Sequence, residues 1–277
     1  MATLSLSAIY VYPVKSLSGI RLERSKVEKK GLALDRRWAI VSPDGRCITQ
    51  RTHPHLALVS VEIEKNCLVL WHREDPEDAL EVPFESETTD FMPVNVWGDV
   101  CLGHMVGAYA DEWLADLLGI EGHLVHMPKR IERVVDSRYT EERELVSFAD
   151  GFPFMVMGEA SLEELNSQLD DEVDALQFRP NLVFRGGVAH VEDSWKRFRV
   201  GDLVFRGVKP CVRDGVLEVD QQTGEKVLEP METLGDYRRF GEHVLFGQNL
   251  LVESEGEIRV GDMITVLETG DLNGLVL

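Results

Sequence analysis

Arg199-Val-Gly-Asp202 and Arg259-Val-Gly-Asp262 are two copies of one tetrapeptide, and each lies between stretches rich in β-forming residues. Gly-Asp at such a position is a signal for the turn of a β-hairpin. Two matching hairpins favour an antiparallel barrel, whereas two copies are too few to indicate a solenoid. The C-terminal part of the chain is therefore predicted to consist mainly of strands.

The first hundred residues also read as strands. Alternating, β-rich sequence covers Ser5–Tyr12, Trp38–Val41, Leu58–Ile63 and Leu68–Trp71, and the last two segments resemble a hairpin. Strands at this spacing with polar turns suggest a barrel or a sandwich. We expect a mainly β (α+β) protein, with a barrel-like N-terminal domain and a second β-barrel with flanking helices.

Two helices interrupt the strands. The spacing of Trp113, Leu114, Leu117 and Leu118 predicts a helix over Asp111–Leu118 that ends at Gly119. Ser161-Leu-Glu-Glu164 has the pattern of a capping box at the start of a second helix. We place the domains at residues 1–120 and 121–268, followed by a tail at residues 269–277.

The charge of the chain restricts its partners. The 277 residues carry a formal net charge of −20, which repels nucleic acid and anionic membrane surfaces. No signal peptide and no apolar run of about 20 residues is apparent, so we expect a cytoplasmic protein that binds neither nucleic acid nor membranes. An anion-binding site in this chain must gather cations against the overall field.

Histidine pairs offer one possible metal site. His53 and His55 form H-P-H, and His123 and His126 form H-x-x-H. Either pair has ligand spacing, but no second cluster accompanies it, and histidines of the surface or core are the favoured interpretation.

Three short motifs place cations beside β-like sequence: Tyr12-Pro-Val-Lys-Ser16, Leu34-Asp-Arg-Arg-Trp38 and Phe178-Arg-Pro-Asn181. Lysine, serine and arginine forks suit a phosphate or a carbonyl-rich ring. An exposed lysine at a strand end, or an ion pair of Asp35 with Arg36, explains the same residues without a ligand. Composition alone does not separate the two interpretations.

Lys209-Pro-Cys211-Val-Arg213-Asp214 brings a thiol, a guanidinium and a carboxylate onto one short segment. An isolated cysteine is more often a small core residue than a ligand, so this segment is a candidate site only.

Taken together, these segments resemble the MOSC proteins with an N-terminal β-barrel extension, the mitochondrial amidoxime-reducing component and its bacterial relatives. The resemblance runs in order along nearly the whole chain. Besides the four motifs above, it rests on Ile48–Arg51, Ser147–Phe154, Glu159–Leu162, Glu192–Trp195, Glu229–Leu234 and Phe246–Asn249.

The resemblance implies a molybdenum–molybdopterin cofactor and the two-electron reduction of small N-hydroxylated substrates; pyridoxal phosphate binding is a further expectation. It implies that Lys15, Ser16 and Arg36 hold the pterin phosphate and its surroundings, and that Asp150, Arg179 and Asn181 line the rest of the site. Cys211 and Arg213 complete the expected cofactor-binding set.

The chain departs from the pattern of these proteins at the metal. Their pattern is Lys-Pro-Cys-x-Arg-Cys, whose second cysteine binds molybdenum, and here that position is Asp214. Three outcomes stay open. Asp214 ligates the metal through oxygen, as a hard ligand for a hard metal; Cys211 takes its place, although three residues along a strand is about 10 Å and the opposite face; or the cofactor is bound without turnover.

The electron supply is a second departure. Some bacterial relatives carry a C-terminal iron–sulfur domain, whereas this sequence has no cysteine after Cys211. We expect electrons from a separate protein. The rival expectation is a non-catalytic module that carries or senses a pterin cofactor or another anion, and a weaker one is a cofactor-free structural descendant.

Overall fold

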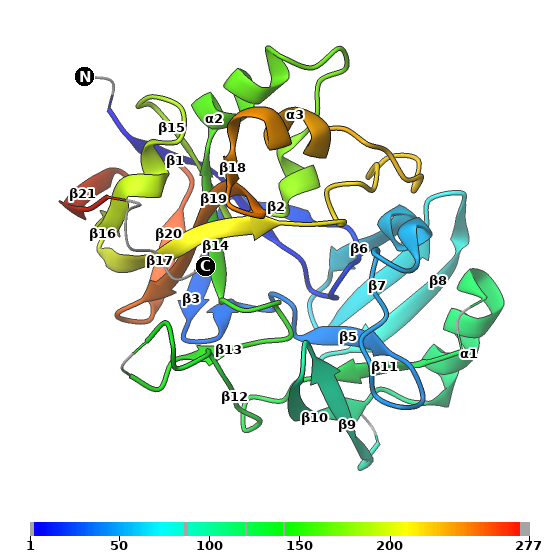
Figure 1. Ribbon diagram of the computed structural model, residues 1–277. Helices are drawn as coiled ribbons and strands as arrows, with labels where there is room; N and C mark the ends of the chain where they lie inside the picture. Colours follow the sequence, from blue (N-terminus) through cyan, green and yellow to red (C-terminus); the bar gives the residue numbers. More distant parts are fainter. Residues whose placement is uncertain (1–2, 86–87, 120, 141, 272–277) are drawn as a thin grey trace.

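A curled sheet of nine strands dominates the larger lobe of the structure (Figure 1). The computed structural model describes residues 3–85, 88–119, 121–140 and 142–271. In order across the sheet, the strands are β2 (Ile20–Leu22), β1 (Ser5–Val11), β15 (Leu182–Arg185), β14 (Phe154–Gly158), β19 (His243–Val252), β17 (Leu203–Arg213), β16 (Trp195–Val200) and β21 (Ile264–Thr269), while β18 (Arg239–Phe240) pairs with β19 off this path.

The predicted strand at Ser5–Tyr12 is confirmed as β1, and it lies inside this sheet. It pairs antiparallel with β15, with Ser5 opposite Arg185 and Ile9 opposite Leu182. The beginning of the chain therefore shares a sheet with strands from the C-terminal half. The division of the chain at residue 120 stays a prediction.

Aromatic side chains fill the inner face of the large sheet. The fully buried set includes Phe154, Phe184, Trp195, Phe198 and Phe205. The rings of Phe154 and Phe205 meet edge to face, with centroids 5.5 Å apart. Each such side chain contributes roughly 1.5–3 kcal/mol when it leaves water, so this core anchors the strands whose ends carry the candidate site.

Short sheets build the smaller lobe. They are β5 (Trp38–Val41) with β11 (His123–His126), β10 (Asp99–Met105) and β9 (Phe91–Val96), and the meander of β6 (Val59–Ile63), β7 (Cys67–His72) and β8 (Asp75–Pro83). The predicted strand Trp38–Val41 is confirmed as β5. The predicted hairpin is confirmed as β6 and β7, with Ile63 opposite Leu68.

Two further small sheets complete the strands. They are β20 (Gly256–Arg259) with β3 (Arg24–Glu28) and β4 (Gly31–Leu32), and β12 (Arg133–Val134) with β13 (Leu145–Val146). Because β20 pairs with β3, the N-terminal and C-terminal halves are joined at a second place.

The two repeated tetrapeptides have different structures. Arg199–Asp202 forms the predicted hairpin turn, since Val200 of β16 is opposite Leu203 of β17. Arg259–Asp262 does not form a hairpin, because β20 pairs with β3 and β21 pairs with β16. The carbonyl of Asp262 instead accepts the backbone N–H of Leu6 (2.8 Å), so contact with β1 directs the second turn.

The first helix, α1 (Ala108–Leu118), confirms the prediction and begins three residues earlier than expected. Trp113 and Leu114 are buried in the core of the smaller lobe, while the side chains of Leu117 and Leu118 lie outside the described part of the structure. Gly119 ends the helix in the left-handed conformation with φ 61°, as its position predicts.

The capping box predicted at Ser161 is wrong. Helix α2 (Glu159–Asn166) begins after Gly158 and has no side-chain cap. The Ser161 hydroxyl donates to Glu192 Oε1 (2.9 Å), and the same oxygen accepts the backbone N–H of Gly158 (3.0 Å). A buried carboxylate from a distant segment has therefore replaced the local cap.

Helix α3 (Met231–Tyr237) and α2 pack on the outer face of the large sheet, against β14, β15 and β19 (Figure 1). The predicted class, mainly β with flanking helices, is confirmed. No helix in the described ranges is both long and apolar enough to span a bilayer. Gly270 N donates to Ser194 O (2.9 Å) just beyond β21, and residues 272–277 of the expected tail lie outside the described residues.

Candidate functional site

A cavity of about 410 Å³ lies where the two lobes meet, at the end of β17. Such a volume is in the range of sites for small organic ligands. Among the described residues, six basic side chains line it against two acidic ones. They are Lys15, Arg36, Arg51, Arg179, Lys209 and Arg213 against Asp150 and Asp214. In a chain of net charge −20, this concentration of cations selects for an anionic ligand.

Lys15 is fixed at the floor of the cavity. Its backbone N–H donates to Trp38 O (2.8 Å), which ties the segment after β1 to β5. Its ammonium donates to Phe148 O (2.9 Å) and pairs with the Asp150 carboxylate. Only 7% of Lys15 is exposed, so the position of its charge is set by the fold.

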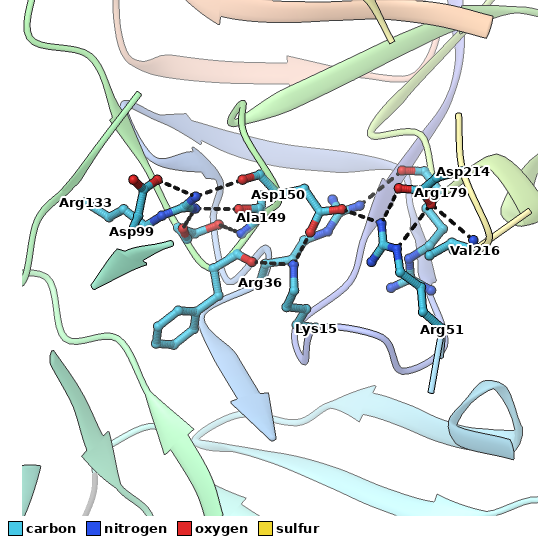
Figure 2. A network of polar contacts seen from close by, with 12 residues as sticks. Lys15, Arg36, Arg51, Asp99, Arg133, Ala149, Asp150, Arg179, Asp214 and Val216 are labelled. Atoms are coloured by element: carbon cyan, nitrogen blue, oxygen red, sulfur yellow. Dashed lines mark hydrogen bonds and ion pairs between the residues drawn. The ribbon is translucent and has the colours of Figure 1, made fainter. Parts of the chain in front are cut away.

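Arg51 joins the two carboxylates of the cavity. Its Nη2 donates to Asp150 Oδ2 (2.9 Å) and to Asp214 Oδ2 (2.8 Å), and its Nε donates to Asp214 Oδ1 (3.2 Å). Figure 2 shows the resulting chain of contacts from Lys15 through Asp150 and Arg51 to Asp214. The guanidinium also lies over the Trp97 ring, 4.8 Å from its centroid.

The Asp150 carboxylate is ionised at neutral pH. Burial alone would raise its pKa, but the charges of Lys15 and Arg51 outweigh burial and hold that pKa well below its usual range. Arg133, which is 4% exposed, secures the same loop by donating to the carbonyls of Ala149 (2.5 Å) and Asp150 (2.8 Å). The loop therefore presents a fixed negative charge between two cations.

Arg36 and Arg179 lie on the ring of the buried Tyr12, at 4.2 and 4.3 Å from its centroid. Arg36 is engaged by Asp35, whose two oxygens accept from Nη1 at 2.9 and 2.7 Å. The ion pair that the sequence suggested thus exists. Arg36 Nη1 also donates to Asn181 Oδ1 (3.3 Å).

Arg179 is the least satisfied cation of the cavity. Burial first, and then the neighbouring charge of Arg36, lower its pKa to about 10. Its Nη1 is buried and has no hydrogen-bond partner among the described residues. A buried donor without an acceptor is costly, so an anion in the cavity would meet a group that the protein itself leaves unpaired.

Backbone strain gathers at this cavity. Of the six described non-glycine residues with positive φ, four line it: Ser16 (71°), Arg36 (47°), Trp97 (55°) and Arg179 (53°). Left-handed backbone is unfavourable for such residues and clusters at functional sites. Three of the four were predicted to be site residues from the sequence.

Asn181 is 2% exposed and is mainly a framework residue. Its amide oxygen accepts the backbone N–H of Met155 (3.2 Å), and its amide nitrogen donates to Tyr10 O (3.2 Å). It also lines the cavity, where its amide joins Tyr10 of β1 to Met155 of β14.

Cys211 and Asp214 both line the cavity, so the expectation that they face opposite sides of a strand is wrong. The pairing of β17 shifts register between Pro210 and Val212, and the strand ends at Arg213. Such a bulge redirects the side chains that follow it. Arg213 Nη1 donates to Cys211 Sγ (3.1 Å), and Asp214 Oδ1 accepts from Val216 N (3.2 Å).

Arg51, Trp97 and Lys209 also line the cavity and were not predicted as site residues from the sequence. Arg51 and Lys209 belong to quoted motifs, and that was the available signal; Trp97 stands at the turn between β9 and β10, with no motif around it. Lys209 Nζ donates to the Tyr139 hydroxyl (3.0 Å).

The histidine pairs do not build a metal site. His123 Nδ1 contacts Asp111 Oδ2 at 2.7 Å, and His126 stacks on Trp38 at 4.5 Å. The described part of the chain holds no cluster of three or more His, Cys, Asp or Glu side chains that could bind a metal ion.

Comparison with known proteins identifies the family of the chain. Residues 3–121 match the MOSC N-terminal beta barrel domain and residues 143–265 match the MOSC domain, and the chain belongs to the family of proteins that combine the two. It is 32% identical to mitochondrial amidoxime-reducing component 1 of Mus musculus, over 95% of this chain and 82% of the relative. It is 31% identical to component 1 of Homo sapiens, over 95% and 83%, and 30% identical to component 2 of Bos taurus, over 94% and 82%.

Proposed function

We propose that the protein is a molybdenum-cofactor-dependent oxidoreductase that reduces N-hydroxylated compounds. One observation carries the proposal: within the part of this acidic protein that the structure describes, six cations surround one cavity and a buried guanidinium nitrogen of Arg179 has no partner. The relatives named as amidoxime-reducing components supply the reaction class.

The residues of the cavity fit the anionic end of a pterin phosphate. Arg179 offers the free donor, and Lys15 supplies a fixed charge at the floor. Lys209, on β17, adds a third charge. Its Nζ also lies over the Tyr139 ring, 4.2 Å from the ring centroid. Charge-assisted hydrogen bonds from such groups are stronger than neutral ones. Arg36, held by Asp35, would position Arg179 by donating to its backbone carbonyl.

The fit at the metal end depends on Asp214. Carboxylate oxygen suits a hard, high-valent metal, and Asp214 lies at the cavity wall after β17. Both of its oxygens accept from Arg51, so metal ligation requires Asp214 to leave Arg51 or to share an oxygen with it. Cys211, which accepts from Arg213, is the second possible ligand of the same wall.

When bound, the cofactor supplies the two-electron chemistry that removes the oxygen of an N–OH group. The chain holds the charges around that reaction. Asp150, whose pKa is depressed by Lys15 and Arg51 against the effect of burial, stays ionised and is not a proton donor at neutral pH. The protons of the reduction must therefore come from another group or from water, and Lys15 and Arg51 offset the negative charge of Asp150 beside an anionic ligand.

The electrons come, in this proposal, from a separate electron-transfer protein in the cytoplasm. The net charge of −20 favours a donor with a basic docking patch, because complementary charge steers association. The substrate is a small N-hydroxylated molecule.

A carrier or sensor of the cofactor is the second candidate function. The engagement of both Asp214 oxygens by Arg51 favours it, because a carboxylate paired with a guanidinium in this way is a weaker ligand for the metal, while the cations of the cavity remain to hold the pterin phosphate.

The deciding experiment compares wild type, Asp214→Cys, Asp214→Ala and the exposed control Asp116→Ala, all purified from a host that makes the cofactor. Molybdenum is measured by mass spectrometry, pterin by fluorescence after oxidation, and reduction of benzamidoxime with a viologen donor. The proposal expects molybdenum, pterin and turnover in wild type and in the control, with turnover lost in Asp214→Ala.

The other results each have a meaning. Pterin without molybdenum in wild type, beside a metal-loaded Asp214→Cys, establishes the carrier. Turnover that survives Asp214→Ala excludes Asp214 as the ligand. Protein without pterin in all four samples overturns the proposed cofactor.

A further inference from the structure

A second cavity, of about 700 Å³, is lined by residues of β3, β5, β10 and β11 and by the segments that follow β8 and β11. It is separate from the first, since no lining residue belongs to both. The Leu34–Trp38 motif stands between them. Arg36 of this motif lines the first cavity, and Leu34, Arg37 and Trp38 line the second.

An aromatic wall forms one side of this second cavity. The Trp38 indole stacks on His126, with centroids 4.5 Å apart and planes at 26°, and Phe84 lies 6.0 Å from the indole. Burial, and then the charge of Arg37, lower the pKa of His126 to about 4, so its ring is neutral at physiological pH. Flat, neutral rings of this kind pack against a planar aromatic ligand.

Two buried donors of the cavity residues lack acceptors. Trp38 Nε1 and Arg37 Nε have no hydrogen-bond partner among the described residues. Trp38 is 1% exposed, and the Arg37 side chain is 7% exposed. An indole N–H and a guanidinium N–H can only donate, so an acceptor oxygen of a ligand would satisfy either of them.

The charges of the cavity are predominantly positive. Lys26, Lys129 and Arg130 are exposed at its rim, with Arg37 deeper inside. The acidic members are Glu28 and Glu85, and Glu28 is already paired with Arg37. As at the first cavity, an excess of cations in an acidic protein favours an anionic ligand.

We propose that this second cavity binds a small planar aromatic anion, with its ring against the aromatic wall and its acid group toward Arg37 and the basic rim. The aromatic wall provides the contact for the ring, and the unpaired nitrogen atoms provide donors for the acid group. The proposal does not depend on the reaction catalysed at the first cavity.

The test uses 2-naphthoate as the probe and 2-naphthylmethanol as its neutral counterpart. Binding is followed by the ¹⁵N–¹H resonance of the Trp38 indole, assigned by its loss in Trp38→Phe. Naphthoate is expected to shift this resonance with a dissociation constant below about 1 mM, and the alcohol to bind at least about tenfold more weakly. A comparison with 2-naphthyl phosphate distinguishes a carboxylate ligand from a phosphate ester.

The variants locate the site. Arg37→Gln is expected to weaken naphthoate binding about tenfold, and Lys129→Gln/Arg130→Gln about threefold, because rim charges contribute less. The double rim variant keeps the test valid if Arg37→Gln does not fold. The exposed control Arg259→Gln, and Arg179→Met at the first cavity, are expected to leave the shift unchanged.

Three results overturn the proposal: no shift of the Trp38 resonance, equal binding of the acid and the alcohol, or loss of the shift in Arg179→Met.

Discussion

Arg51 and Asp214, 163 positions apart in the chain, meet in a two-pronged contact: Nε to Oδ1 at 3.2 Å and Nη2 to Oδ2 at 2.8 Å. Such a fork fixes the plane of the carboxylate as well as its distance. In the wild type, Asp214 can therefore bind the metal only if Arg51 releases its carboxylate or shares one of its oxygens with the metal.

Arg51→Gln tests the competition between the guanidinium and the metal. Removing the fork frees both Asp214 oxygens, so we expect the ratio of molybdenum to pterin in the purified protein to rise by about twofold or more, since a charge-assisted contact no longer opposes ligation. The ratio corrects for any general loss of cofactor. Arg46→Gln, at an 80% exposed side chain, is the control; an unchanged ratio would show that Arg51 does not restrain the ligand.

Arg179→Met separates stability from binding. Its Nη1 has no acceptor among the residues that the structure describes, and burial with the charge of Arg36 lowers its pKa to about 10. We expect an apolar side chain there to raise the free energy of unfolding by about 1 kcal/mol. Pyrophosphate should stabilise wild type and not the variant in urea titrations. A less stable variant that still responds to pyrophosphate would contradict the assignment, and Arg138→Met is the exposed control.

The pH dependence of stability tests the ion pair between Lys15 and Asp150. The folded-state pKa of Asp150 is depressed, so its contribution is present above the unfolded value near 3.8 and is lost as the pH falls below about 4. Lys15→Met should lower the free energy of unfolding at pH 7 by about 1–3 kcal/mol. We expect a value toward the lower end of this range, because the Asp150 side chain is 48% exposed and solvent screens the ion pair. We expect the difference from wild type, measured by chemical denaturation, to narrow at pH 3.

A difference that stays constant between pH 7 and pH 3 would assign the effect of Lys15→Met to lost packing. Lys65→Met, on the exposed surface, controls for the general change in net charge.

Ser161 and Glu164 were expected to act together in a local cap, and the structure separates them. Ser161 is fully buried, donates to Glu192 Oε1 (2.9 Å) and accepts from His190 N (2.8 Å), whereas Glu164 is largely exposed. Ser161→Ala should lower the free energy of unfolding by about 1–3 kcal/mol, because it removes one of the two donors to the buried Glu192 Oε1 and leaves the backbone N–H of His190 without its acceptor. Glu164→Ala should change it by less than about 0.5 kcal/mol; equal effects in thermal or chemical unfolding would favour the local cap.

The sequence predicted elements whose signals are local. Alternation placed β1, β5 and the β6–β7 hairpin within about a residue, and Gly119 marked the end of α1. Arg199–Asp202 and Arg259–Asp262 are nearly identical locally, yet only the first is a hairpin turn. The difference arises from β3, which pairs with β20, and no local pattern contains that partner.

The candidate site was predictable in its members but not in its connections. Lys15, Arg36, Arg179 and Asp214 were singled out from their motifs, and all line one cavity. Arg51 was missed because its importance comes from two carboxylates far away in the chain. The common location of Cys211 and Asp214 depends on a bulge in β17, and a bulge leaves no reliable trace in residue types.

The position of β1 has a consequence for how the protein is made. As the chain leaves the ribosome, Ser5 to Ile9 emerge early, but their antiparallel partners, Arg185 to Leu182, are synthesised far later. At about 5–20 residues per second, the edge of the first strand that pairs with β15 stays unpaired for on the order of ten seconds. Contacts of such sequence separation slow folding, so the nascent N-terminal half exposes an unpaired strand edge, which is the kind of surface that chaperones protect.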